Sequence, residues 1–259
     1  MKIYIMSDME GVSGIHCAEY VRPGNHQYNE GRRLLTADVN AAVEGALAGG
    51  ADQVYVSDTH GGCDHFIIED LHQAAIVDHN ATGWWGELDE TFDGVFMTCA
   101  HAMAGTQNAF LDHTQSSASV YNFRLNGRAC GELGQFACMA GHFGVPVVLV
   151  TGDRAACEEA REFFPGVETA EVKWARSRLR AVCLSPEKGQ ALIRDAAARA
   201  VKLCKTVKPF KVKTPIEVVW EYFRTEFADS HAKRPGVDRI DSRAVRYTVD
   251  SQLDIFAHR

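Results

Sequence analysis

Ile3-Tyr4-Ile5-Met6, an apolar run of strand length, leads directly into Ser7-Asp8-Met9-Glu10-Gly11. Side chains two positions apart on an extended strand point the same way, so we expect the carboxylates of Asp8 and Glu10 to converge where a buried strand leaves the core. Two like charges at such a place are costly unless a cation or a shared proton compensates them. In an open α/β sheet, ligands bind at the carboxyl ends of the strands. The start of the chain is therefore a candidate metal or acid–base site.

Length and composition limit the class of protein. The chain has 259 residues, 46% of them hydrophobic, which suits one large α/β domain or a large domain plus a small one. A formal net charge of −7 without long blocks of like charge argues against nucleic acid or an anionic membrane as the main partner. The N-terminal apolar run is too short for a signal peptide, and no segment approaches the ~20 apolar residues of a membrane span. We therefore expect a cytoplasmic protein.

Apolar periodicity predicts alternating strands and helices up to residue 166. Residues 30–48 carry apolar side chains at helical spacing, and the short strands at 3–6 and 54–56 on either side complete a βαβ unit with parallel, neighbouring strands. Asn126-Gly127 predicts a tight hairpin turn. Further strands are expected at 75–77, 94–101, 119–125, 128–130 and 147–150, and further helices at 131–143 and from the cap Asp153 to about Phe163.

The pattern changes at about Val167. Shorter strands are expected at 167–174 and 181–184, a helix at 186–205, and longer, more exposed strands at 215–223 and 244–249. We therefore predict a three-layer α/β/α fold with a mostly parallel sheet in residues 1–166. Residues 167–259 are expected to form a smaller α+β lobe packed against it.

Polar side chains follow three of the predicted strands. They are Asp8 with Glu10, Asp58 with His60, and His101, and Glu132 begins the helix after the hairpin. A parallel sheet gathers the carboxyl ends of its strands at one edge, and carboxylates with imidazoles suit a divalent metal. The set is large enough for two ions bridged by one carboxylate, the usual clamp for hydrolysis of an amide or a phosphate ester.

Each of these residues also has a purely structural explanation. A single histidine at a strand end is more often a hydrogen-bonded structural residue, Asp58 is compatible with an Asx turn, and Glu132 with a carboxylate facing a helix dipole. His113, in a polar loop, is equally compatible with a general acid or base and with a surface residue. Cysteines near the candidate ligands (Cys63 and Cys99) suit packing better than nucleophilic catalysis. The coincidence of several strand ends favours the metal site.

Four motifs follow one another in a specific order: Ser7-Asp8-Met9-Glu10-Gly11, Asp58-Thr59-His60, Ala100-His101-Ala102 and Gly131-Glu132-Leu133-Gly134. In this combination and spacing the chain resembles the zinc-dependent D-aminopeptidase family, of the DppA type, over most of its length. The resemblance implies two zinc ions per chain bridged by Asp8. Glu10 and His60 would complete one ion, and His101 and Glu132 the other.

The resemblance also implies a catalytic histidine. His113 matches the family pattern at this position less closely than the five ligand residues match it at theirs. The segment 103–112 is slightly longer than in the family, and Asp112 and Thr114 replace the serines expected on either side of His113. The implied activity is removal of the N-terminal residue, D-configured, from short peptides by a water activated by the two zinc ions. Trp84-Trp85, flanked by glycines, is a candidate contact of the ring-built homo-oligomer, a decamer, that the family implies.

Two other functions stay open at this stage. A metal-dependent amidase of the same fold could act on a different amide, because the metal set fixes the reaction class and not the side-chain pocket. A non-catalytic peptide-binding protein is the other alternative, although an apparently complete ligand set counts against it.

Overall fold

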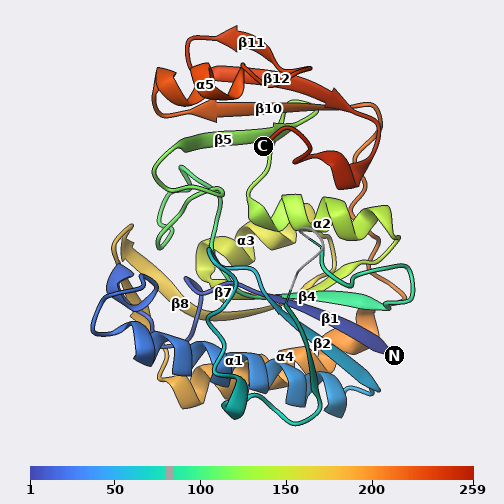
Figure 1. Ribbon diagram of the computed structural model, residues 1–259. Helices are drawn as coiled ribbons and strands as arrows, with labels where there is room; N and C mark the ends of the chain where they lie inside the picture. The colour runs from blue at the N-terminus through green and yellow to red at the C-terminus, as the bar shows by residue number, and fades with distance from the viewer. Residues whose placement is uncertain (80–84) are drawn as a thin grey trace.

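A seven-stranded, mostly parallel sheet forms the centre of the computed structural model, which describes residues 1–79 and 85–259 (Figure 1). Its order is β3-β2-β1-β4-β7-β8-β9, and β9 alone runs antiparallel to its neighbour in this sheet. The predicted parallel pairing of the first two strands is confirmed. The strands are β1 (Lys2–Ser7), β2 (Gln53–Asp58), β3 (Ala75–Asp78), β4 (Gly94–Ala100), β7 (Val147–Asp153), β8 (Glu168–Ser177) and β9 (Arg180–Cys183).

Helices cover both faces of this sheet, so the predicted three-layer α/β/α arrangement is confirmed (Figure 1). Because side chains alternate along β1, Ile3 and Ile5 belong to the core beneath α1 (Tyr28–Ala48) and α4 (Pro186–Ala200). Tyr4 and Met6 belong to the opposite core. That core contains α2 (Glu132–His142) and α3 (Arg154–Phe163). Single 3-10 turns lie at η1 (Ala18–Tyr20), η2 (Ile68–Asp70), η3 (Val201–Leu203) and η4 (Gln252–Asp254).

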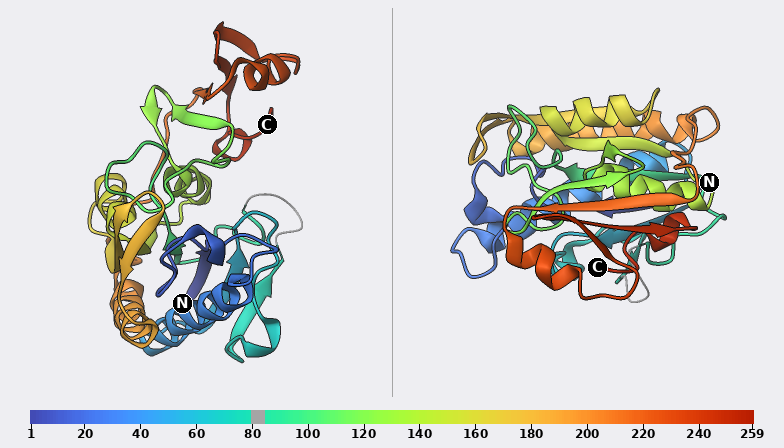
Figure 2. Two further views of the ribbon diagram at one scale, coloured as in Figure 1. Left: turned by 90° about the vertical axis from the view of Figure 1, so that its left-hand side faces the viewer. Right: turned by 90° about the horizontal axis from the view of Figure 1, so that it is seen from above.

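A second sheet of five strands lies above α2 (Figures 1 and 2). It is antiparallel, in the order β11-β12-β10-β5-β6, and it carries the short helix α5 (Thr225–His231). Since α2 lies between two sheets, its residues 133–141 are all buried. Positive φ angles of 49° at Asn126 and 82° at Gly127 confirm the predicted hairpin turn. The strands are β5 (Val120–Leu125), β6 (Arg128–Ala129), β10 (Ile216–Tyr222), β11 (Asp238–Asp241) and β12 (Ala244–Val249).

The sheets divide the chain differently from the expected boundary at residue 167. β8, β9 and α4 complete the large sheet and its helical layer, whereas β5 and β6 pair within the small sheet. Apolar alternation indicates that a segment is a strand, but not which sheet it joins, because that choice depends on contacts distant in sequence. The division into domains at 1–166 and 167–259 stays a prediction.

The predicted contact residues Trp84-Trp85 fall only in part within the described residues. Trp84 lies outside the described residues, and Trp85 is partly buried against the core between the two sheets. Among the described residues, no helix combines the length and the apolar character that crossing a bilayer requires.

The carboxyl edge of the large sheet is where the polar residues gather. Ser7 pairs with both Asp58 and Thr98, so three neighbouring strands end at the same level. The loop after β1 then passes directly over the end of β4, where the Gly11 N–H donates to the carbonyl of Cys99 at 2.7 Å. A β-carbon on Gly11 would lie 2.3 Å from the Ala100 carbonyl oxygen, so this crossing requires glycine.

Candidate metal centre

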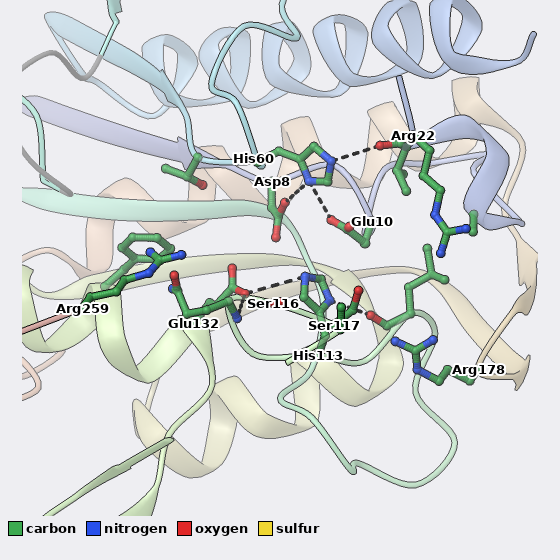
Figure 3. Close-up of a pocket in the computed structure, with 18 residues that line it drawn as sticks. Asp8, Glu10, Arg22, His60, His113, Ser116, Ser117, Glu132, Arg178 and Arg259 are labelled. Atoms are coloured by element: carbon green, nitrogen blue, oxygen red, sulfur yellow. Dashed lines mark hydrogen bonds and ion pairs between the residues drawn. The ribbon is translucent and has the colours of Figure 1, made fainter. Parts of the chain in front are cut away.

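Five of the predicted side chains meet at this edge. Figure 3 shows four of them, Asp8, Glu10, His60 and Glu132. Nδ1 of His60, which follows β2, lies 2.9 Å from Asp8 Oδ1 and 3.2 Å from Glu10 Oε2. Nε2 of His101, which follows β4, lies 3.1 Å from Asp8 Oδ2 and 3.7 Å from Glu132 Oε2. The two oxygens of Asp8 therefore face two different groups of potential ligands.

Backbone carbonyls fix the orientation of the three imidazoles in and beside this centre. A carbonyl oxygen only accepts hydrogen bonds, so the ring nitrogen next to it must carry the proton. The other nitrogen of each neutral ring then has a lone pair, and it faces a carboxylate. The contacts are His60 Nε2 with Val21 O at 3.1 Å, His101 Nδ1 with Ala102 O at 2.9 Å, and His113 Nδ1 with Leu111 O at 2.8 Å.

A divalent cation fits this arrangement. Lone pairs that face carboxylates repel them unless positive charge lies between, and backbone carbonyls that orient ligating imidazoles are typical of metal sites. Among the described residues, Glu10 Oε2 and His101 Nε2 are buried polar atoms without a hydrogen-bond partner. Nitrogen and oxygen donors of this kind suit zinc. The residues present are therefore compatible with the two ions that the sequence suggested.

Without metal, the carboxylates favour protonation of the neighbouring histidines. Burial alone would lower the pKa of His60 and of His101, but the charges of Glu10, Asp8 and Glu132 outweigh it and raise both well above their ordinary value. Burial alone would raise the pKa of Asp8, but its contacts with His101 and His60 hold that pKa well below its ordinary value. The carboxylates of the centre thus favour positive charge between them, either on protonated histidines or on metal ions.

His113 lies beside the five residues rather than among them. Its ring stacks on His101 with centroids 3.9 Å apart and planes 12° apart. Its Nε2 lies 3.8 Å from Glu132 Oε1, the oxygen that already accepts the backbone N–H of Gln115 at 2.6 Å. The side chain of His113 is 16% exposed and that of His101 is 1% exposed, so His113 is the one that borders the open cavity. That cavity has a volume of about 340 Å³.

Asp58 and two cysteines near the centre have structural roles. The Asp58 carboxylate accepts the backbone N–H of His60 at 3.1 Å and that of His65 at 2.6 Å, which is the turn-forming explanation. Burial raises the pKa of the thiols of Cys63 and Cys99, which disfavours the reactive thiolate. Both cysteines have positive φ angles, 54° at Cys63 in the loop after β2 and 59° at Cys99 near the end of β4, so they shape the backbone beside the ligands.

A buried lysine that the sequence interpretation missed holds the ligand loop from below. Lys173 on β8 is fully buried, and its Nζ donates to the carbonyls of Glu10 and Ile15, both at 2.7 Å. The buried carboxylate of Asp38 accepts the backbone N–H of Ser13 in the same loop at 2.7 Å. The only sequence signal was a lysine inside an apolar strand, which a solvent-facing position explains equally well.

Two acidic residues hold the loop that carries His101 and His113. Asp153 accepts the N–H of Ala156 at 2.9 Å, as the predicted cap of α3, and its second oxygen accepts the N–H of Phe110 at 2.9 Å. Glu159 accepts the N–H of Met103 at 2.8 Å, and burial raises its pKa to about 7. The role of Asp153 in the loop and that of Glu159 had no signal in the sequence.

Comparison with known proteins decides the family. The family model for D-aminopeptidases, Peptidase M55, matches residues 1–258. The chain belongs to the D-aminopeptidase family. A D-aminopeptidase of Bacillus subtilis (strain 168) is 36% identical over 212 residues, which cover 81% of this chain and 77% of the relative. The solved structure of the Zn-dependent D-aminopeptidase DppA from Bacillus subtilis, described as a self-compartmentalizing protease, is 31% identical. It superposes with a TM-score of 0.95 and covers 100% of this chain and 95% of its own.

Membership of this family confirms the resemblance that the four motifs carried, and the mixed α/β fold with its second lobe agrees with the solved structure. The five side chains that the sequence proposed as ligands lie together in this D-aminopeptidase. Their binding of metal, and the catalytic role of His113, stay proposals.

The raised and lowered pKa values predict how zinc should stabilise the protein as the pH changes. The contribution of His60 and His101 to metal-free stability is complete below pH 6.5 and is lost as the pH rises through their raised pKa. That of Asp8 is present above pH 3.8 and is lost as the pH falls through its lowered pKa. Zinc bound by these histidines would have to displace their protons, so its binding should be weaker in acid.

We therefore expect zinc to raise the melting temperature of chelator-treated protein more at about pH 8.5 than at about pH 6. Differential scanning fluorimetry with and without zinc at both pH values measures this. A zinc-induced shift that is equal at both values, or larger at the lower one, would contradict the ligand role of the two histidines.

Proposed function

We propose that the chain is a zinc-dependent aminopeptidase that removes an N-terminal D-residue from short peptides. The observation that carries the proposal is the position of Asp8, whose two oxygens face two separate groups of potential ligands. Membership of the D-aminopeptidase family and similarity to a zinc-dependent relative support the same conclusion. The metal-dependent amidase is thereby less well supported, and so is the peptide-binding protein.

Asp8 would bridge two zinc ions in this proposal. Glu10 and His60 would complete one ion, and His101 and Glu132 the other. Bound there, the ions would supply two effects: a lower pKa of water, which yields a nucleophile at neutral pH, and polarisation of the peptide carbonyl. The carbonyls that hold the histidine rings would keep the ligating nitrogens aimed at the metals, so that few rearrangements accompany the reaction.

His113 would donate a proton or a hydrogen bond to the substrate. Its Nδ1 proton is held by the carbonyl of Leu111, so Nε2 is the atom that can exchange a proton. Attack on the peptide carbonyl creates an oxyanion and later an amine that must be protonated to leave. In its protonated form His113 donates from Nε2 to one of these atoms. Stacking on the buried His101 ring limits the positions that the imidazole of His113 can take.

We also propose that the chain forms a homo-oligomer, as the self-compartmentalizing relative does, with the decamer as the expected size. The small sheet offers exposed apolar side chains, including Tyr121, Phe223 and Ile240. Its outer strand β11 is exposed at all four residues and leaves one edge of that sheet open. These features suit a contact with another copy. A cytoplasmic location stays a prediction from the sequence.

Metal content and cleavage of D-Ala-D-Ala, measured on one preparation, test the activity. We expect about two zinc ions per chain and cleavage that prefers D-Ala to L-Ala at the N-terminus. Asp8→Asn should lose both the metal and the cleavage, because it removes the shared ligand. Asp195→Asn, an exposed acid on α4, is the matched control and should change neither.

Each contrary result selects an alternative. Bound metal without cleavage of D- or L-peptides would point to the amidase. Tight peptide binding without metal and without cleavage would point to the binding protein.

The role of His113 has its own test. We expect His113→Gln to keep both zinc ions and to lower kcat by about 10²–10⁴, the usual contribution of a general acid or base. His142→Gln, at the exposed end of α2, serves as the control and should retain full activity. A loss of zinc in His113→Gln would instead identify His113 as a ligand, and an unchanged kcat would exclude it from the reaction.

A further inference from the structure

A second cavity adjoins the one at the metal centre. It has a volume of about 210 Å³ and lies against the small sheet and α5, with Trp220 and Tyr222 of β10 in its wall. Gln115, Ser116 and Arg259 line both cavities, so these residues form the boundary that the two cavities share. A peptide that extends from the metal centre past this boundary would reach the small sheet.

The two cavities differ in their charged side chains. The first is lined by three carboxylates, those of Asp8, Glu10 and Glu132, and by three arginines, Arg22, Arg178 and Arg259. The described residues that line the second include two arginines, Arg234 and Arg259, and no aspartate or glutamate. Two guanidinium groups in one small cavity repel each other, and an anion between the cavity walls would relieve that repulsion.

Arg259 is held at the junction of the two cavities. The preceding carbonyl, that of His258, accepts hydrogen bonds from Arg234 Nη1 and from His231 Nε2, both at 2.6 Å. The guanidinium lies on the Glu132 side of the pocket, apart from Arg22 and Arg178 (Figure 3). Burial lowers its pKa while the charge of Glu132 opposes that effect. A guanidinium therefore lies on the Glu132 side of the pocket, in the wall that the two cavities share.

We propose that Arg259 binds the free α-carboxylate of a short peptide whose N-terminal residue lies at the metal centre. The inference rests on the proposed aminopeptidase function and adds the class of substrate: peptides of a few residues with an unblocked carboxyl end. A guanidinium binds a carboxylate through two parallel, charge-assisted hydrogen bonds, which an amide cannot replace. Trp220 and Tyr222 would contact the last side chain of the peptide, and Arg234 would keep Arg259 in position.

The test compares D-Ala-Gly-Gly with its C-terminal amide on the zinc-loaded, full-length protein. We expect wild type to prefer the free acid by roughly tenfold or more in kcat/KM, mainly through KM, because one charge-assisted interaction is lost with the amide. In Arg259→Met the ratio should approach one, with zinc content unchanged. Arg259→Lys should restore part of the preference. Arg243→Met, an exposed arginine of the same lobe outside both cavities, should keep the wild-type ratio.

Three results would overturn the inference while leaving the aminopeptidase in place. They are equal rates of wild type on acid and amide, an unchanged preference in Arg259→Met, and a loss of zinc in that variant, which would assign Arg259 to the metal centre instead. Failure of zinc-loaded wild type to cleave either peptide would overturn the proposed function, and this inference with it.

Discussion

The carboxylate of Asp8 lies between two imidazoles, each held by a backbone carbonyl with its other nitrogen turned toward a carboxylate. This arrangement is unfavourable unless cations occupy it, because buried lone pairs and anions repel one another. In the free protein the neighbouring carboxylates raise the pKa of both histidines for that reason. Two zinc ions would replace those protons with a larger positive charge at the same place. The chemistry that we propose, activation of water beside a polarised carbonyl, follows from this single constraint.

The rest of the fold keeps these atoms in position. A parallel sheet brings the ends of β1, β2 and β4 to one level, and the Gly11 crossing brings the loop after β1 close over β4. Lys173 fixes that loop through its carbonyls, at the cost of burying a charge whose pKa is lowered by desolvation. The second sheet closes over α2 and adds a cavity lined by Arg234 and Arg259 beside the one at the metal centre. In our proposals, metal ligation and peptide recognition thus come from different parts of the chain.

Much of the fold and the five converging side chains could be predicted from the sequence. Buried parallel strands are short apolar runs, and a polar residue that ends such a run is placed by the strand itself, as for Asp8 and His101. The features that could not be predicted depend on information that local sequence patterns do not contain. β8 reads as a strand whichever sheet it joins, α5 is a single short helix, and the exposed β11 has no apolar alternation. The roles of Lys173, Glu159 and Arg259 depend on contacts between segments far apart in the chain.

An anomalous-scattering map of crystals of the zinc-loaded protein, collected at the zinc absorption edge, tests the central claim most directly. The account predicts two peaks on either side of the Asp8 carboxylate, one next to Glu10 and His60 and the other next to His101 and Glu132. A single peak that leaves one of these groups without metal, or peaks remote from Asp8, would contradict it.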